Sequence, residues 1–304
     1  MTMWTLNAST AAFGVLFLIA CDKSQPPAPD TPQPSIAASG ATAQPETATV
    51  TVSGSSALQP LVNAAKEQFE ASHKGISIEV SAGGSKKGLA DVASGAVQIG
   101  DSDIFAAADQ QAQLVDHRVA VVGFAAMANK GLFNEKVGAV GMDAIAKVFL
   151  GKTTNWKDLG GGAQPIVIIN RSPNSGTRAV FGSVVLGGDK FVEGQTEDNS
   201  GALVAKLKQT KGAISYLALS FADPELLVLS LKNDAGVVEA SAPNITAGLY
   251  PIWSYEHMYT KGQPTKAAKE FLDYMLSPGF QDHVLPTVKG FIPVTQMKVS
   301  RDKD

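Results

Sequence analysis

The chain has 304 residues, of which 44% are hydrophobic and 17% are charged. This composition is typical of a folded protein, argues against disorder for most of the chain, and leaves room for two lobes of ordinary domain size. The formal net charge of −3 at pH 7 gives no indication of a polyanionic partner such as DNA or RNA. An anionic ligand would have to be attracted by local hydrogen-bond donors, because the overall charge opposes it slightly.

The first 21 residues predict export and lipid attachment. Residues 11–20 form an apolar run that is too short to span a membrane but fits the core of a signal peptide. The run ends in Leu18-Ile19-Ala20-Cys21, which resembles a bacterial lipobox, whose cysteine receives lipid and becomes the mature N-terminus. A plain secretory peptide is the alternative, and the absence of Lys and Arg before the apolar run is atypical. Cys21 is the only cysteine, so no intrachain disulfide can form.

Residues 22–48 predict a flexible or extended tether, because Pro, Ala and small polar residues dominate and no apolar periodicity is present. Folded structure is expected from Thr49. Alternating residues predict strands at 49–54, 76–80 and 96–100, with a helix from the spacing of Leu58, Leu61, Val62, Ala65 and Phe69 and a short helix around 89–93. This βαβαβ order predicts a mainly parallel sheet with helices on its faces.

The same α/β pattern continues through the rest of the chain. In such sheets ligands bind beyond the carboxyl ends of the strands, where loops lead into helices. The predicted elements after residues 118–130 are helices at 142–151, 177–187 and 265–277, strands at 165–170, 213–219 and 250–260, and a last short helix before 288–294.

Two glycine-containing loops carry serines at the start of a helix. In the loop 53–60, Ser55 and Ser56 precede a helix, and three serines around a glycine exceed what simple N-capping requires. In the loop 81–92, Ser85 opens the next helix, and the sequence lacks the middle glycine of the dinucleotide fingerprint. Lys86 and Lys87 follow at a place that the helix dipole disfavours for cations, which indicates either a nearby anion or solvated surface charges.

Two further loops carry charged residues. Asp101 and Asp103 follow a predicted strand, but no histidine or further acid clusters with them, so the alternative is an N-cap and a surface acid. Arg171 ends a predicted strand, and Ser175-Gly176-Thr177 begins a helix. The guanidinium offers a bidentate fork to an oxyanion, and the hydroxyls and amides add neutral donors. The alternative is a capped helix with surface arginines.

No catalytic, metal or cofactor site is predicted. Residues 151–153 (Gly-Lys-Thr) resemble the end of a P-loop, but position 146 is alanine where that motif needs glycine. There is no G-x-S-x-G motif. The four histidines (His73, His117, His257 and His283) lack metal-ligand spacing and are interpreted as surface or core residues.

Taken together, the loops resemble those of the substrate-binding proteins of high-affinity phosphate ABC transporters. The resemblance covers most of 49–300 and rests on several motifs in the same order, among them SGSSALQPL, SAGGSKKGLADV, INRSPNSGTRAVF and YPIWSYEHMYTKG. The R-x-x-x-S-G-T phosphate loop of that family falls on Arg171 and Ser175-Gly176-Thr177, and its Ser-Asp position falls on Asp103. Lys86-Lys87 is a departure, because relatives carry small residues there.

This resemblance implies a type II periplasmic-binding-protein clamp of two lobes, with crossover hinge strands near 122–128 and 247–254. Lobe I would be 49–124 with 250–300, and lobe II would be 125–249. The expected protein is a monomeric, lipid-anchored, extracytoplasmic binding protein that delivers inorganic phosphate to permease subunits and makes or breaks no bond. Sulfate or molybdate binding, phosphate sensing and phosphate-ester hydrolysis are the alternatives. The phosphate-binding residues that it implies are Ser55, Ser56, Ala57, Leu58, Ser85, Asp103, Arg171, Ser175, Gly176 and Thr177.

Overall fold

The computed structural model describes residues 47–130 and 138–302. The predicted signal peptide (1–21), including Cys21, and the predicted tether (22–48) up to residue 46 lie outside the described residues. In the described ranges no helix is both long and apolar enough to cross a membrane.

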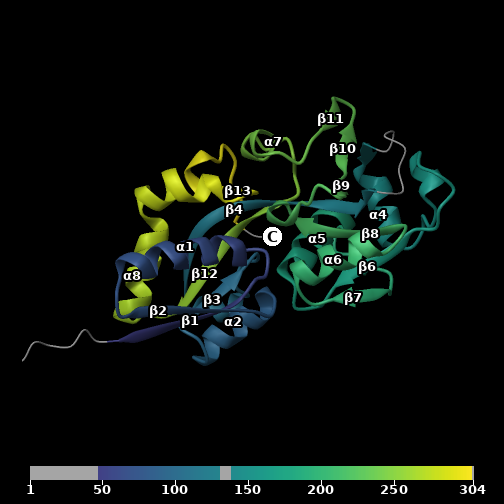
Figure 1. Cartoon of the computed structure of the whole chain (residues 1–304). Coiled ribbons are helices and arrows are strands. Elements are labelled where there is room, and N and C mark those ends of the chain that lie inside the picture. The colour runs from purple at the N-terminus through teal and green to yellow at the C-terminus, as the bar shows by residue number, and fades with distance from the viewer. Residues whose placement is uncertain (1–46, 131–137, 303–304) are drawn as a thin grey trace, which may run out of the picture. The chain divides into compact units, whose positions relative to one another are not determined.

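The fold is α/β, as predicted, and is built on one long curled sheet (Figure 1). Its strands follow the order β2-β1-β3-β12-β4-β8-β6-β7, and β9 and β13 pair with β4. These strands are β1 (Ala48–Gly54), β2 (Ile76–Ala82), β3 (Ile99–Ser102), β4 (Leu114–Asn129), β6 (Val167–Arg171), β7 (Gln195–Glu197), β8 (Ala213–Ala218), β9 (Leu226–Val228), β12 (Trp253–Lys261) and β13 (Phe291–Ile292). A smaller sheet contains β5 (Ala139–Gly141), β10 (Ser230–Asn233) and β11 (Gly236–Val238).

The helices pack on this sheet in the places that their apolar residues require. The α1 spacing is confirmed, because Leu61, Val62, Ala65 and Phe69 are its buried residues. Helices α1 and α8 lie together on the opposite side of the β1–β3 region from α2 (Figure 1). The helices are α1 (Gln59–Ser72), α2 (Ser85–Ser94), α3 (Ala108–Gln111), α4 (Met142–Phe149), α5 (Gly176–Leu186), α6 (Ser200–Gln209), α7 (Ala242–Thr246) and α8 (Lys266–Leu276), with short turns η2 (Trp156–Leu159), η3 (Leu219–Phe221), η4 (Phe280–Val284), η5 (Leu285–Thr287) and η6 (Val294–Gln296).

The expectation of a mainly parallel sheet is wrong at the centre of the sheet. Strand β1 pairs in parallel with β2 and β3, and β6 pairs in parallel with β7 and β8. However, β12 pairs antiparallel with both β3 and β4, and β4 pairs antiparallel with β8. The sheet is therefore mixed, because a strand from the C-terminal part of the chain is inserted between β3 and β4.

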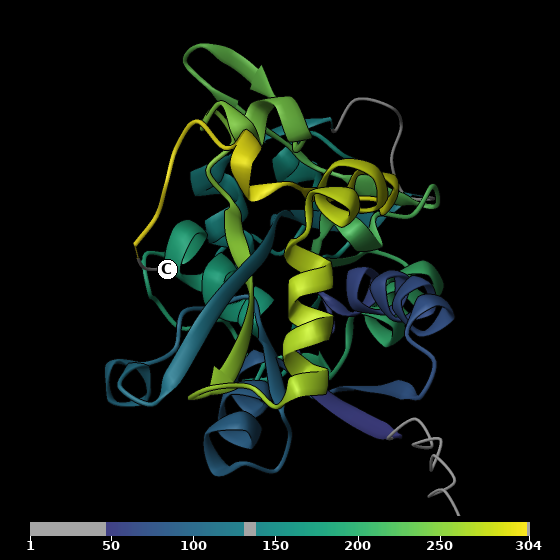
Figure 2. The same cartoon turned by 90° about the vertical axis from the view of Figure 1, so that its left-hand side faces the viewer.

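Strand β4 connects the two halves of the sheet (Figures 1 and 2). It pairs with β12 from Leu114 to Gly123, and then with β8 from Phe124 to Ala128. Residues 44–304 form one compact unit by their contacts, so the division into lobes at 124/125 and 249/250 stays a prediction. Strand β3 runs from Ile99 to Ser102 instead of the predicted 96–100, and because it ends later than predicted, Asp101 lies within the strand rather than after it.

Candidate anion-binding site

Asp103 lies in the loop after β3, where it contacts residues of three other loops, namely Ser55, Ser85 and Thr177. It follows β3 directly, and it is 1% exposed. Its carboxylate accepts hydrogen bonds from the hydroxyl of Ser55 and, at 2.9 Å, from the hydroxyl of Thr177. Its backbone N–H donates to Ser85 Oγ at 2.9 Å. The alternative of an N-cap and a surface acid is wrong, because Asp101 and Asp103 are both buried.

Arg171 is the buried cation of the site. It ends β6 and is 1% exposed. Its guanidinium donates to Ser56 Oγ at 3.0 Å and to Ser200 Oγ at 3.2 Å, with a longer contact of 3.5 Å to the backbone carbonyl of Asp198. Burial lowers the pKa of Arg171, while the nearby charge of Asp103 opposes that shift. Within the described ranges this guanidinium forms no ion pair and its Nε has no partner, so an anionic ligand would complete its coordination.

Four helix N-termini bring backbone amides to the same region. Ser175 caps α5 by accepting from the backbone N–H of Arg178 at 3.2 Å, and Asn199 caps α6 in the same way. Ser55 Oγ accepts from the amides of Ala57 and Leu58, just before α1, and Ser85 is the first residue of α2. Because a helix N-terminus carries partial positive charge and unpaired N–H groups, this arrangement favours an anion.

The two sides of the site are in direct contact. Ser56 Oγ lies 3.0 Å from Ser200 Oγ, and the backbone N–H of Lys86 donates to the carbonyl of Asn174 at 3.1 Å. A Cβ atom at Gly176 would lie 2.8 Å from Ser85 Cβ and would overlap the Ser85 hydroxyl. Glycine is therefore required at this position of the Ser-Gly-Thr motif, because any side chain would hold the two sides apart.

The structure brings the predicted residues together. The predicted helix starts at Ser85 and at Ser175-Gly176-Thr177 are confirmed. Lys86 is exposed, and Lys87 forms an ion pair with Asp91 within α2. This ion pair accounts for the position of Lys87, and no anionic ligand is needed beside it. The predicted binding residues Ser55, Ser56, Ala57, Leu58, Ser85, Asp103, Arg171, Ser175, Gly176 and Thr177 are all buried.

The sequence analysis missed Ser200, which contacts both Arg171 and Ser56. Its hydroxyl accepts from Arg171, and its backbone N–H donates to Ser56 Oγ at 3.2 Å. A signal was present, because Asn199 is a good N-cap and Leu203 and Leu207 follow at helical spacing. Helix α6, and with it Ser200, could have been predicted from these residues.

Two more carboxyl groups lie beside Asp103. Asp101 on β3 and Glu256 on β12 are both buried. Burial, followed by the charge of Asp103, raises the pKa of Asp101 well above its ordinary value, and the same two causes raise the pKa of Glu256. In the part of the chain that the structure describes, no group of three or more His, Cys, Asp or Glu side chains could hold a metal ion.

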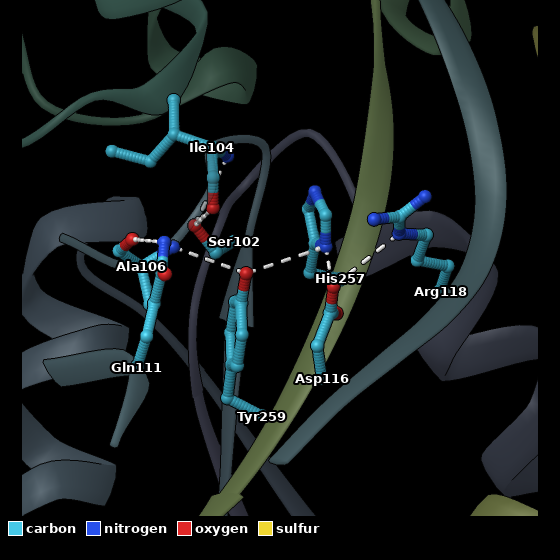
Figure 3. A network of polar contacts seen from close by, with 8 residues as sticks. All are labelled: Ser102, Ile104, Ala106, Gln111, Asp116, Arg118, His257 and Tyr259. Atoms are coloured by element: carbon cyan, nitrogen blue, oxygen red, sulfur yellow. Dashed lines mark hydrogen bonds and ion pairs between the residues drawn. The ribbon is translucent and has the colours of Figure 1, made fainter. Parts of the chain in front are cut away.

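The residue after Glu256 belongs to a different polar network (Figure 3). His257 Nδ1 lies 2.7 Å from Asp116 Oδ1, and Asp116 also pairs with Arg118 at 3.4 Å. The hydroxyl of Tyr259 lies 3.4 Å from the same His257 nitrogen and accepts from the backbone N–H of Ala106 at 3.1 Å. His257 is thus a core residue, as interpreted from the sequence, and this network links β12, β4 and the loop after β3.

The fold and the geometry of the site are those of an α/β binding protein whose site, between helix N-termini, is suited to an anion. Comparison with known proteins agrees with this class. A sequence model described as a PBP superfamily domain matches residues 39–278. The phosphate-binding protein PstS of Bacillus subtilis (strain 168) is 48% identical over 258 residues, which cover 83% of this chain and 83% of that protein. The chain therefore belongs to the PBP superfamily and, within it, to the family of phosphate-binding proteins that includes this relative.

Solved structures give the same result. A candidate phosphate ABC transporter substrate-binding protein from Clostridium perfringens, solved with bound phosphate, is 29% identical with a TM-score of 0.74, and the match covers 81% of this chain and 99% of that one. An ABC-type phosphate transport receptor from Vibrio cholerae has a TM-score of 0.63 at 20% identity, over 80% of this chain and 99% of that one, and shows the fold alone.

Proposed function

We propose that this protein binds inorganic phosphate outside the cytoplasm and delivers it to the permease of an ABC transporter. Membership of the family supports the proposal, and one observation in the site carries it. The guanidinium of Arg171 is buried among hydroxyl groups, forms no ion pair within the described ranges, and lies near the buried acceptor Asp103. A buried cation of this kind needs a counter-ion, and its planar fork fits two oxygens of a tetrahedral anion.

The ligand shell would contain one charge and many neutral donors. Arg171 would bind two phosphate oxygens, and the hydroxyls of Ser56 and Ser175 would donate to others. Ser175 Oγ accepts from the helix amide, and its hydrogen can still be donated. The ten proposed contact residues are Ser55, Ser56, Ala57, Leu58, Ser85, Asp103, Arg171, Ser175, Gly176 and Thr177.

Asp103 would select phosphate against sulfate and molybdate. At neutral pH phosphate keeps at least one proton, and the carboxylate can accept a hydrogen bond from that P–OH group. A fully deprotonated tetrahedral anion would instead place its oxygens against a buried carboxylate. In a site without water this mismatch costs several kcal/mol.

Phosphate entry would require the two sides of the site to separate. The residues that contact each other across the site are buried, so a ligand cannot reach Arg171 in this conformation. We propose a clamp with lobe I at 49–124 and 250–300 and lobe II at 125–249, which opens at the crossover strands near 122–128 and 247–254. Closure around phosphate would create the surface that the permease recognises.

The protein would act without catalysis and, we propose, as a monomer. The relatives are named for phosphate binding and not for a reaction, which supports a binding role. Leu18-Ile19-Ala20-Cys21 and the Pro-rich residues after it support a lipid anchor at Cys21. Such an anchor would hold the protein at the outer face of a membrane.

The experiment that tests this function is calorimetric titration of the purified full chain with phosphate, sulfate and molybdate at neutral pH. We expect saturable 1:1 binding of phosphate and no detectable binding of the other two anions. Tighter binding of sulfate or molybdate would show that another oxyanion is the ligand. Phosphate uptake by a deletion strain separates a transport component, whose loss reduces uptake, from a phosphate sensor.

A further inference from the structure

Glu256 is a buried carboxyl group that the proposed ligand shell does not use. It is 0% exposed, and within the described ranges no donor group forms a hydrogen bond with either of its oxygens. Strand β12 pairs with β3 so that His257 lies opposite Ser102 and Met258 lies opposite Asp101. Continued by one position, the same register would place Glu256 opposite Asp103, and cross-strand partners project their side chains to the same face of a sheet. Glu256 therefore lies directly beside the carboxylate that is proposed to receive the phosphate hydroxyl.

A proton on one of these two buried carboxyl groups would relieve the repulsion between them. Ionised carboxylates are acceptors only, so two of them can form a hydrogen bond only when one is protonated. Burial, followed by the charges of Asp103 and Asp101, raises the pKa of Glu256. Two carboxylates side by side in a dry site cannot both be ionised at neutral pH. In this arrangement Glu256 keeps its proton at neutral pH and can donate it in a hydrogen bond to Asp103.

No cation among the described residues replaces this proton. The neighbouring His257 is committed to Asp116 in the network on the other side of β12 (Figure 3). Arg171 acts on Asp103, and its hydrogen bonds go to serines and a backbone carbonyl. The other charged or titratable groups on the elements packed against β12 are Asp101 of β3, Asp116, His117 and Arg118 of β4, and Lys86, Lys87 and Asp91 of α2.

The proton of Glu256 also limits what Asp103 can bind. An ionised carboxylate has about four lone-pair directions. Ser55 and Thr177 occupy two of them, and a hydroxyl of protonated Glu256 would occupy a third. One direction then remains, and it suits the single P–OH of monohydrogen phosphate.

We propose that Glu256 is a positioning residue that holds a proton toward Asp103, so that the pair carries one negative charge when phosphate binds and binding weakens when alkaline pH removes the proton. This inference rests on the proposed phosphate-binding function. Glu256 does not touch phosphate in this scheme and acts only through Asp103.

The test compares phosphate affinity of the full chain and of its Glu256→Gln variant from about pH 6 to about pH 10, a range that extends to alkaline values at which a buried carboxyl group with a raised pKa loses its proton. The glutamine amide donates to Asp103 at every pH and cannot ionise. Both proteins bind the same ligand, so the ratio of their Kd values removes the ionisation of phosphate itself. The matched control is Glu67→Gln, which changes an exposed glutamate on α1.

We expect the Kd values of wild type and Glu256→Gln to agree within about threefold near neutral pH. Above the raised folded-state pKa of Glu256, the wild-type Kd should rise relative to that of the variant by up to about tenfold per pH unit. Glu67→Gln should follow the wild type throughout. A ratio that stays constant over the whole range overturns the inference, whereas a wild type that binds no phosphate at any pH overturns the proposed function on which it rests.

A second measurement uses only the wild type, in case the variant does not fold. Calorimetric titrations in two buffers of different ionisation enthalpy report the protons taken up when phosphate binds. Uptake by the protein should be close to zero near neutral pH and should increase at alkaline pH, where Glu256 of the ligand-free protein has lost its proton. Absence of alkaline proton uptake would contradict the inference.

The stability of the ligand-free protein gives an independent check of the sign. The folded-state pKa of Glu256 is raised above its ordinary value of 4.5, so the folded state binds more protons than the unfolded state above that pH. The contribution of Glu256 to the free energy of unfolding is therefore present at low pH and declines as pH rises through the folded pKa. Glu256→Gln should become progressively more stable than wild type over this window, and an unchanged difference would contradict a proton held by Glu256.

Discussion

The Asp103→Asn variant should gain sulfate binding. The Asp103 carboxylate is buried, and it would meet a sulfate oxygen with no proton between them. Two unit charges about 4 Å apart repel each other by about 4 kcal/mol at an effective dielectric constant of about 20. Asparagine removes this charge and offers an N–H donor next to its acceptor oxygen. Relief of about 2 to 4 kcal/mol should strengthen sulfate binding by roughly 30-fold to 1,000-fold, which makes it measurable.

Phosphate binding by Asp103→Asn should weaken less than binding by Arg171→Ala, because the amide oxygen can still accept from P–OH. The matched control is Asp101→Asn, two residues earlier on β3. Burial raises the pKa of Asp101 and so favours its neutral form, and an amide of the same shape should change sulfate binding little. The assay is parallel calorimetric titration with sulfate and phosphate at neutral pH and fixed ionic strength. If Asp101→Asn alone gained sulfate binding, the selecting aspartate would be misassigned; if neither did, discrimination would come from elsewhere in the site.

Three further variants test the site and the anchor. Arg171→Ala should lose about 2 to 5 kcal/mol of phosphate-binding free energy, measured by titration, because it removes a buried charge-assisted contact. The control Lys269→Ala makes the same change in net charge at an exposed residue, and its Kd for phosphate should stay within about threefold of wild type. Gly176→Ala should reduce phosphate affinity because its methyl group keeps the two sides apart, while Gly201→Ala, whose added Cβ has 3.6 Å of clearance at the nearest atom, should bind as wild type does. Cys21→Ser should release the protein from membranes, and equal palmitate labelling of variant and wild type would contradict a lipid anchor.

Much of the site could be predicted because its residues are carried by local patterns. A strand that ends at Arg171 and a helix that begins after Ser175 are both visible in a dozen residues, since apolar runs flank a capping serine and a glycine. The same holds for the helices that start near Ser55 and Ser85. Each pattern alone also fits simple capping, and only their order along the chain indicated that they form one site.

The rest depended on pairing between distant segments. Glu256 lies beside Asp103 because β12 inserts next to β3, about 150 residues away in sequence, and no periodicity within β12 reports its neighbours. The mixed sheet was mispredicted for the same reason, since βαβ order describes each half and not the strand that joins them. Burial of Asp101 followed from β3 extending to Ser102, beyond its predicted end at residue 100.

The central claim is that Arg171 and Asp103 bind one phosphate ion between the two sides of the site. A crystal structure of the full chain grown with phosphate tests it most directly. We predict one tetrahedral anion with oxygens about 3 Å from both the Arg171 guanidinium and the Asp103 carboxylate. An anion bound elsewhere, or an Arg171 that still contacts only Ser56 and Ser200 in protein saturated with phosphate, would contradict the account.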